Sequence, residues 1–332
     1  MPEVDGISFV KLLGGCQFKQ NSILFISSHE PKIISAAEVV AKHYNMNVLS
    51  SLRKPIKRES LLHAISNEKK DDPPIKPPSK REVDLIEIDR CLKAGHFLPY
   101  YQPKFDVVSL KCIGAEMLAR CFHPDHGVLS PDEFSALFKN KDAEAILMRQ
   151  LLTQSFSSLA KWNNAGFRIS LAINFNWHLF KNDSFLTFLK HEVVKRNIDP
   201  NDLVIEIVES EAMTDLPVAL GNMASLRLHG FGIALDDFGS GYANFEKLAH
   251  LPLTQIKLDR SLLSSAKKRI DGMTVLAATV DLAKKLVGEV VLEGIEDKQD
   301  LNIARQLGIR QGQGYFFSKP IPEHEFESRY IL

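Results

Sequence analysis

Short apolar runs alternate with helix-sized gaps over most of the chain. From Met148 to Leu159, apolar residues recur with spacings of four, four and three, which places them on one face of a helix. A second helical pattern extends from about 274 to 286. Short strands that alternate with helices are typical of a parallel α/β sheet. The strand candidates lie at 97–106, 111–119, 169–175, 203–208, 232–236, 255–258, 289–293 and 311–316.

Eight strands favour a closed (β/α)8 barrel over an open, doubly wound sheet. The segment that contains them, residues 84–332, has about the length of a typical barrel of this class, which is ~250 residues. Before it, residues 67–83 hold four prolines and many charges with almost nothing to bury, which is typical of an extended, semi-rigid linker. We therefore predict an N-terminal segment at 1–68, a linker at 69–83 and a barrel domain at 84–332.

Composition and charge exclude several classes of protein. The hydrophobic set makes up 45% and the charged set 25% of the residues, which is typical of a globular domain. Lys+Arg and Asp+Glu both number 41, so a globally basic DNA-binding protein is not expected. No apolar run approaches the ~18–20 residues of a membrane span, and the N-terminus has acids where a signal peptide needs basic residues. We expect a cytoplasmic location, with free thiols at Cys16, Cys91, Cys112 and Cys121.

Polar residues gather where the predicted strands end. Side chains alternate along a strand, so Glu116 and Arg120 share one face of the second strand. Asp236 lies at the end of the fifth strand and Asp237 just beyond it. A single acid at a strand end is more often a helix cap or a surface charge, so the prediction rests on seven strands together. Because such ends meet at one mouth of a barrel, we expect a site there, to which the other strands add Asn174, Glu206, Lys257, Glu293 and Gln313.

The charges at this mouth indicate metal ions. Five carboxylates that close together cannot all stay ionised without compensation. Lys257 offsets one charge, and the remaining four correspond to about two divalent cations. Carboxylates with one Asn amide suit Mg²⁺ or Mn²⁺ rather than zinc, and two such ions ~3.5–4 Å apart are the usual arrangement for hydrolysing phosphate esters. The five carboxylates are Glu116, Glu206, Asp236, Asp237 and Glu293.

Eight motifs follow one another along 84–332: YYQP (100–103), GAEMLAR (114–120), INFN (173–176), EIVES (206–210), LDDFGSGYANF (235–245), IKLDR (256–260), LEGIE (292–296) and QGYFFSKP (313–320). In this order they resemble the EAL domain, a bacterial phosphodiesterase domain that hydrolyses cyclic di-GMP. The resemblance implies a (β/α)8 barrel with one antiparallel strand. It also implies metal-dependent hydrolysis of cyclic di-GMP to linear pGpG, with Mg²⁺ or Mn²⁺ as cofactor, in second-messenger signalling.

The resemblance implies a metal-binding or catalytic role for most of the strand-end residues. Lys257 would steady the attacking water, and Glu293 would be either a metal ligand or the general base. Glu209 would hold the loop 238–245, which in this family couples the metal site to the dimer interface, so we expect a homodimer. The remaining metal ligands would be Glu116, Asn174, Glu206, Asp236 and Asp237.

Three further residues would contact the substrate. Gln102 and Gln313 match the two glutamines near the family's site. Arg120 matches an arginine that contacts a substrate phosphate, for which a guanidinium fork suits better than an amine.

The departures from the family pattern leave every implied metal ligand in place. The signature alanine is Met117, on the opposite face of its strand from Glu116, and a usual threonine is Val208. The usual threonine after LEGIE is Asp297, and two frequent loop serines are Ala243 and Asn244. Two alternatives stay open: a catalytically inactive EAL domain that acts as a cyclic di-GMP receptor, and a barrel hydrolase for another phosphodiester.

The N-terminal segment carries weaker motifs: MPEVDG (1–6), SILFISSHE (22–30) with Ser27, VLSSLRKPI (48–56) with Lys54 and Pro55, and KRESLLHAI (57–65). They resemble the second half of a response-regulator receiver domain, which implies a histidine kinase or another signalling partner. The phosphoacceptor aspartate would precede Met1, so we interpret the sequence as a truncated or mis-started receiver–EAL regulator. The other interpretation is a small α/β dimerisation segment.

One further cluster has the composition of a metal site. His123, Asp125 and His126 fall in CFHPDHG, directly after a strand. Because proline and glycine flank them, we predict a solvated turn.

Overall fold

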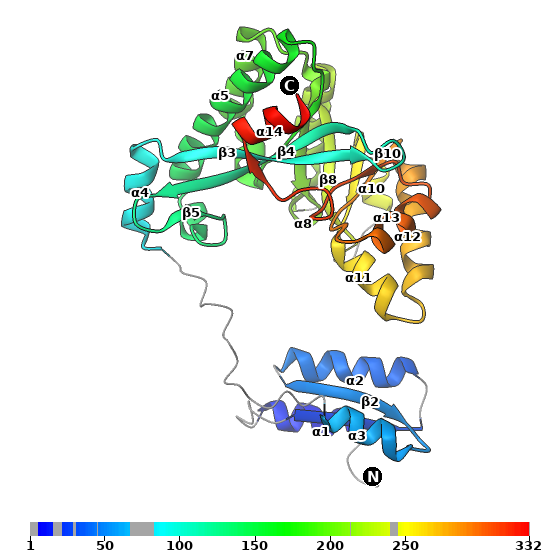
Figure 1. Cartoon of the computed structure of the whole chain (residues 1–332). Helices are drawn as coiled ribbons and strands as arrows, with labels where there is room; N and C mark the ends of the chain where they lie inside the picture. The colour runs from blue at the N-terminus through cyan, green and yellow to red at the C-terminus, as the bar shows by residue number, and fades with distance from the viewer. Residues whose placement is uncertain are drawn as a thin grey trace. The chain divides into compact units, whose positions relative to one another are not determined.

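A computed structural model describes residues 6–15, 22–28, 31–44, 46–66, 83–212, 214–239 and 245–331 (Figure 1). The chain divides into two compact units, Met1–Ser79 and Lys80–Leu332. Cys16, the linker prediction up to residue 82 and loop residues 240–244 lie outside the described residues.

The second unit contains a closed eight-stranded barrel, which confirms the predicted fold class. Each strand pairs with its neighbour along the chain, and the first strand pairs with both the second and the last, which closes the ring. The first strand is antiparallel to both neighbours and the other pairs are parallel. The barrel strands are β3 (Phe97–Asp106), β4 (Cys112–His123), β6 (Ser170–Asn174), β7 (Leu203–Val208), β8 (Gly232–Phe238), β9 (Gln255–Leu258), β10 (Glu289–Leu292) and β11 (Gln311–Gly312).

Two short strands extend the sheet beyond the barrel. β5 (Gly127–Leu129) pairs with the far end of β4, and β12 (Ile321–Pro322) pairs with β3.

Helices surround the barrel, as the apolar spacing predicts. The first predicted pattern lies in α5 (Lys141–Asn164), whose Asn140 cap accepts the backbone N–H groups of Asp142 and Ala143. The second lies in α12 (Gly272–Leu286). The others are α4 (Leu85–Lys93), η1 (Ser135–Lys139), α6 (Trp177–Phe180), α7 (Asp183–Lys195), η2 (Pro200–Asp202), α8 (Glu209–Ala212), α9 (Leu216–Leu228), α10 (Phe245–Leu248), α11 (Arg260–Lys268), α13 (Lys298–Gln306) and α14 (Glu323–Tyr330).

The main core lies between the strands and these helices. It contains the outward-facing residues of the barrel, among them Ile205 and Met117, together with the buried face of α5. Met117 is therefore packed away from Glu116, as predicted. Inside the barrel, Ala172, Val204 and Ala234 form a separate cluster of small side chains, which leaves room for longer polar ones.

Three strand ends differ from the sequence prediction by two residues or more. β8 continues to Phe238, so Asp237 lies within the strand rather than beyond it. β4 continues to His123 because β5 pairs with it. β11 ends at Gly312, because the chain then turns around Ile295, which exchanges backbone hydrogen bonds with residues 313 and 316.

The first unit has a small core of its own. β1 (Ser22–Ser27) and β2 (Asn47–Arg53) pair in parallel and are connected by α2 (Pro31–His43). Val10, Ala41 and Met46 form the buried cluster. The remaining helices are α1 (Gly6–Gly15) and α3 (Arg58–Ser66). The receiver resemblance stays a prediction.

Two expectations concern the whole chain. Cys91, Cys112 and Cys121 are unpaired thiols in the structure. In the part of the chain that the structure describes, no helix is long and apolar enough to cross a membrane.

Candidate active site

Lys257 lies at the centre of a carboxylate cluster inside the barrel. It projects from β9, is 1% exposed, and contacts carboxylates that come from four different strands or strand ends. A buried ammonium group requires such partners, because its desolvation is otherwise too costly. Its Nζ lies 2.7 Å from Glu206, 2.8 Å from Glu293, 3.0 Å from Asp236 and 3.6 Å from Glu116.

Glu116 is held by amide groups on both of its oxygens. Asn174 Nδ2 donates to Oε1 at 2.6 Å, and Gln313 Nε2 donates to Oε2 at 2.6 Å. Gln313 also donates to Glu293 at 3.3 Å. The two amides therefore lie in the same cluster as the carboxylates, although Asn174 and Gln313 are far apart in the sequence.

A bulge in β8 brings two consecutive aspartates to the site. The pairing of β8 with β9 shifts register between Leu235 and Phe238, and Asp237 has a φ of 57°. Strict alternation would place the side chains of Asp236 and Asp237 on opposite faces, and the bulge removes that restriction. Oxygens of Asp236, Asp237 and Glu293 lie within 4.8 Å of one another.

Burial and mutual repulsion shift the pKa values of the acids in this cluster. Burial raises the pKa of Glu206 to about 8, against the attraction of Lys257, and burial raises the pKa of Glu293 to about 7. Burial also opposes ionisation of Glu116, but Lys257 and the two amides outweigh it and lower its pKa. Burial and the neighbouring Asp236 raise the pKa of Asp237. Burial is the largest single effect on each of these pKa values, and repulsion among the acids adds to the raised pKa values of Glu206, Glu293 and Asp237.

The donor set fits divalent cations. All of its members offer oxygen, which suits Mg²⁺ or Mn²⁺. Glu206 Oε1 and Gln313 Oε1 are buried and have no hydrogen-bond partner among the described residues. Asp236, Asp237 and Glu293 could hold one ion, while Glu116, Asn174 and Glu206 offer oxygens on neighbouring strands. The assignment of individual ligands stays a prediction.

Lys104 is a component of the site that sequence reasoning missed. It projects from β3, is fully buried, and its Nζ lies 3.8 Å from Glu206 Oε1. The signal was its position two residues after Gln102, which places both on one face of the strand. With this second ammonium group, three rather than four negative charges of the site lack a compensating positive charge.

Two of the three predicted substrate residues, Gln102 and Gln313, line one cavity, and Arg120 is not among its lining residues. Gln102 is buried, donates to the carbonyl of Ser318 at 3.3 Å, and lines a cavity of about 280 Å³ together with Asp237, Glu293 and Gln313. Arg120 also lies on β4, opposite Leu98 of β3. Its Cζ atom is 5.7 Å from the centre of the Tyr100 ring.

Glu209 begins α8, directly after β7. It is 8% exposed, burial raises its pKa, and it accepts the backbone N–H of Gly239. It therefore contacts the start of the predicted loop, whose residues 240–244 lie outside the described residues.

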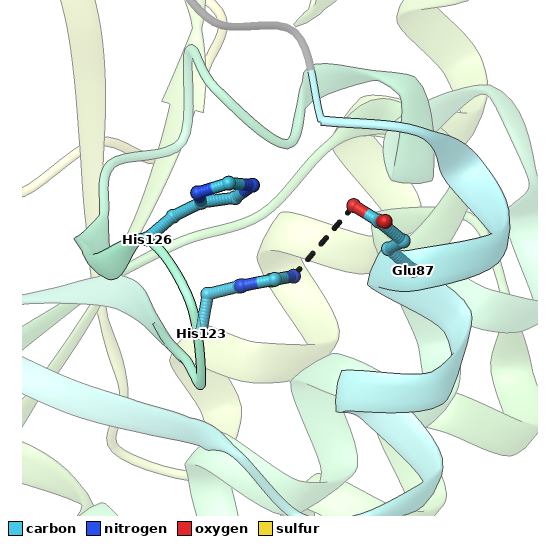
Figure 2. Close-up of side chains that lie close together, drawn as sticks. All are labelled: Glu87, His123 and His126. Atoms are coloured by element: carbon cyan, nitrogen blue, oxygen red, sulfur yellow. Dashed lines mark ion pairs between the residues drawn. The ribbon is translucent and has the colours of Figure 1, made fainter.

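A second cluster joins α4 to the hairpin between β4 and β5. Figure 2 shows His123 and His126 extending toward Glu87. His123 is 4% exposed, so the prediction of a solvated turn is wrong for this residue: α4 packs against the hairpin and covers it. His123 Nδ1 accepts the N–H of Asp125 at 3.2 Å, so the ring proton lies on Nε2, which faces Glu87 at 3.8 Å. That nitrogen is a donor rather than a free lone pair, so we assign no metal to this cluster.

Comparison with known proteins identifies the class of barrel. The family model of the EAL domain matches residues 87–320, and the chain belongs to this family. It is similar to the cyclic di-GMP phosphodiesterase RocR of Pseudomonas aeruginosa, with 30% identity over 330 residues, 98% of this chain and 83% of RocR.

Solved structures agree with this assignment. The c-di-GMP complex of the PaMucR phosphodiesterase aligns with a TM-score of 0.69 and 26% identity, over 73% of this chain and 98% of that one. The Bacillus subtilis YkuI protein, solved with c-di-GMP and calcium, aligns with a TM-score of 0.62 and 24% identity, over 72% of this chain and 58% of that one. The latter likeness concerns the fold.

Proposed function

We propose that this protein hydrolyses cyclic di-GMP to linear pGpG with the help of Mg²⁺ or Mn²⁺. The observation that carries the proposal is the buried cluster of four carboxylates around Lys257, to which the β8 bulge adds Asp237. The similarity to RocR and to the PaMucR phosphodiesterase supports cyclic di-GMP as the substrate.

The side chains divide the work between cation binding and substrate binding. The cation ligands would be Glu116, Asn174, Glu206, Asp236 and Asp237, and bound cations would stabilise charge on the phosphate and lower the pKa of the attacking water. Glu293 would accept the proton of that water or serve as a further ligand, and Lys257 would hold the water and the carboxylates in register. Arg120 would bind a phosphate through its guanidinium fork, with Gln102 and Gln313 lining the cavity.

The test measures pGpG formation by chromatography with Mg²⁺ or Mn²⁺. Glu116→Gln removes a charge from the cluster with little change in shape, and we expect it to lower kcat at least about 100-fold, because a ligand charge is lost. Glu325→Gln is the matched control: Glu325 lies on α14, outside the barrel interior, and pairs with Arg329. It should retain activity. Equal loss in both variants, or product formation in the presence of a chelator, would contradict the proposed site.

An inactive cyclic di-GMP receptor is the second candidate. The comparisons leave it open, and it predicts nucleotide binding without pGpG formation under every cation condition. A calorimetric titration of the wild-type protein beside the product assay therefore separates the two functions.

The remaining proposals concern organisation and location. We propose that residues 1–68, 69–83 and 84–332 are a receiver-like segment, a linker and the catalytic domain. We further propose a cytoplasmic homodimer whose N-terminal segment receives a signal from a histidine kinase or another partner.

A further inference from the structure

Lys104 is a second ammonium group buried in the barrel. It projects from β3, the antiparallel strand, and its side chain is 0% exposed, as is that of its nearest carboxylate, Glu206. Charges at this depth are screened little by salt or water, so each acts on the whole cluster.

Gln255 fixes the position of this ammonium group. Its Nε2 donates to Gln311 at 3.1 Å and to Glu289 at 3.3 Å, so its amide oxygen faces Lys104 and accepts a hydrogen bond at 3.3 Å. Lys104 is thereby held between an amide oxygen on one side and Glu206 on the other. It cannot leave the barrel without breaking both contacts.

Lys104 changes the net charge of the cation-loaded site. Five carboxylates and two ammonium groups leave three negative charges in the site. Two divalent cations would bring four positive charges, so the loaded site would carry a net charge of one positive unit. Without Lys104 the loaded site would be neutral. A phosphodiester group carries one negative charge, so the surplus charge favours its binding.

On the basis of the proposed function, we propose that Lys104 supplies the positive charge that draws the substrate phosphodiester to the cation-loaded site. Lys104 acts through space and through Glu206, without contact with the substrate, and is therefore a positioning residue. The same charge repels the cations. Its removal should change the affinities for cation and for nucleotide in opposite directions, which a merely structural defect would not do.

The test uses the full chain and two binding titrations by calorimetry at pH 8.5. The first measures Mg²⁺ alone, and the second measures cyclic di-GMP in excess Ca²⁺, since the YkuI protein holds c-di-GMP together with calcium. For Lys104→Met we expect tighter Mg²⁺ binding and about tenfold weaker nucleotide binding, the effect of one charge over roughly 10 Å at an effective dielectric constant near 20. Gln255→Leu, which removes the hydrogen-bond partner and keeps the charge, should change both affinities by less than about threefold.

The outcomes distinguish a failure of this inference from a failure of the proposed function. If both affinities fall together in Lys104→Met, or neither changes, Lys104 has no electrostatic role of this kind. If Lys104→Met does not fold, as judged by circular dichroism, Lys104→Gln replaces it and the same criteria apply. If the wild-type protein binds Mg²⁺ but not cyclic di-GMP, the proposed function fails, and this inference fails with it.

Discussion

Glu144 offers a quantitative test of the packing behind the site. It lies in the first turn of α5, is 2% exposed, and accepts a hydrogen bond from Asn176. Its other oxygen lies 3.2 Å from His178 Nε2. Asn176 directly precedes α6 and His178 lies within it, both shortly after Asn174 in the sequence, so the contact supports the backbone beside a predicted metal ligand.

The pKa shifts give the magnitude and the sign of the expected change in folding stability with pH. Burial, with a contribution from Glu211, raises the pKa of Glu144 from 4.5 to about 7, and burial lowers the pKa of His178. A protonated Glu144 carboxyl that donates a hydrogen bond to a neutral His178 imidazole is consistent with both pKa shifts. Because the folded chain holds this proton while the unfolded chain has lost it, stability falls as the pH rises from about 4.5 to 7. The full difference between the two pKa values of Glu144 corresponds to about 3 kcal/mol of unfolding free energy.

Glu144→Gln removes this titration and retains an amide of the same shape. We expect the variant to be more stable than the wild type by about 2–3 kcal/mol at pH 8, and nearly equal to it at pH 5. The assay is urea denaturation of the full chain at both pH values, followed by the fluorescence of the barrel.

Glu192→Gln is the matched control on α7. Glu192 is also buried, but Arg196 outweighs its burial and lowers its pKa, so this variant should lose stability at both pH values. A stability gain of Glu144→Gln that is equal at pH 5 and pH 8, or a loss at pH 8, would refute the reasoning about the buried proton.

Two further predictions concern the mouth of the barrel. Asp237→Gly should raise the melting temperature, since it relieves a positive φ that costs roughly 1 kcal/mol and removes a repelled charge, while kcat falls because a predicted ligand is lost. An unchanged kcat would exclude Asp237 from the reaction. Arg120→Lys should raise KM for cyclic di-GMP about tenfold and leave Mg²⁺ affinity unaltered, because an ammonium group cannot replace a bidentate fork. A weaker Mg²⁺ affinity in that variant, measured by calorimetry, would indicate that Arg120 supports the cation site instead.

The sequence by itself determined the barrel and most of its polar lining. Strands such as β7 and β9 were predicted at their observed bounds, because their buried apolar residues form short runs between helices. Alternation along each strand also placed Glu116, Glu206 and Lys257 on the inner face, and closure of the barrel then brings them together.

Only the tertiary structure decided the details that depend on neighbouring strands. The bulge that brings Asp237 beside Asp236 arises from the register between β8 and β9, which no local pattern encodes. The burial of His123 depends on α4, and the role of Lys104 depends on Glu206, about one hundred residues further along the chain. A sequence pattern reports which face a side chain occupies, whereas its charge partners and solvent exposure are set by residues brought close only when the barrel closes.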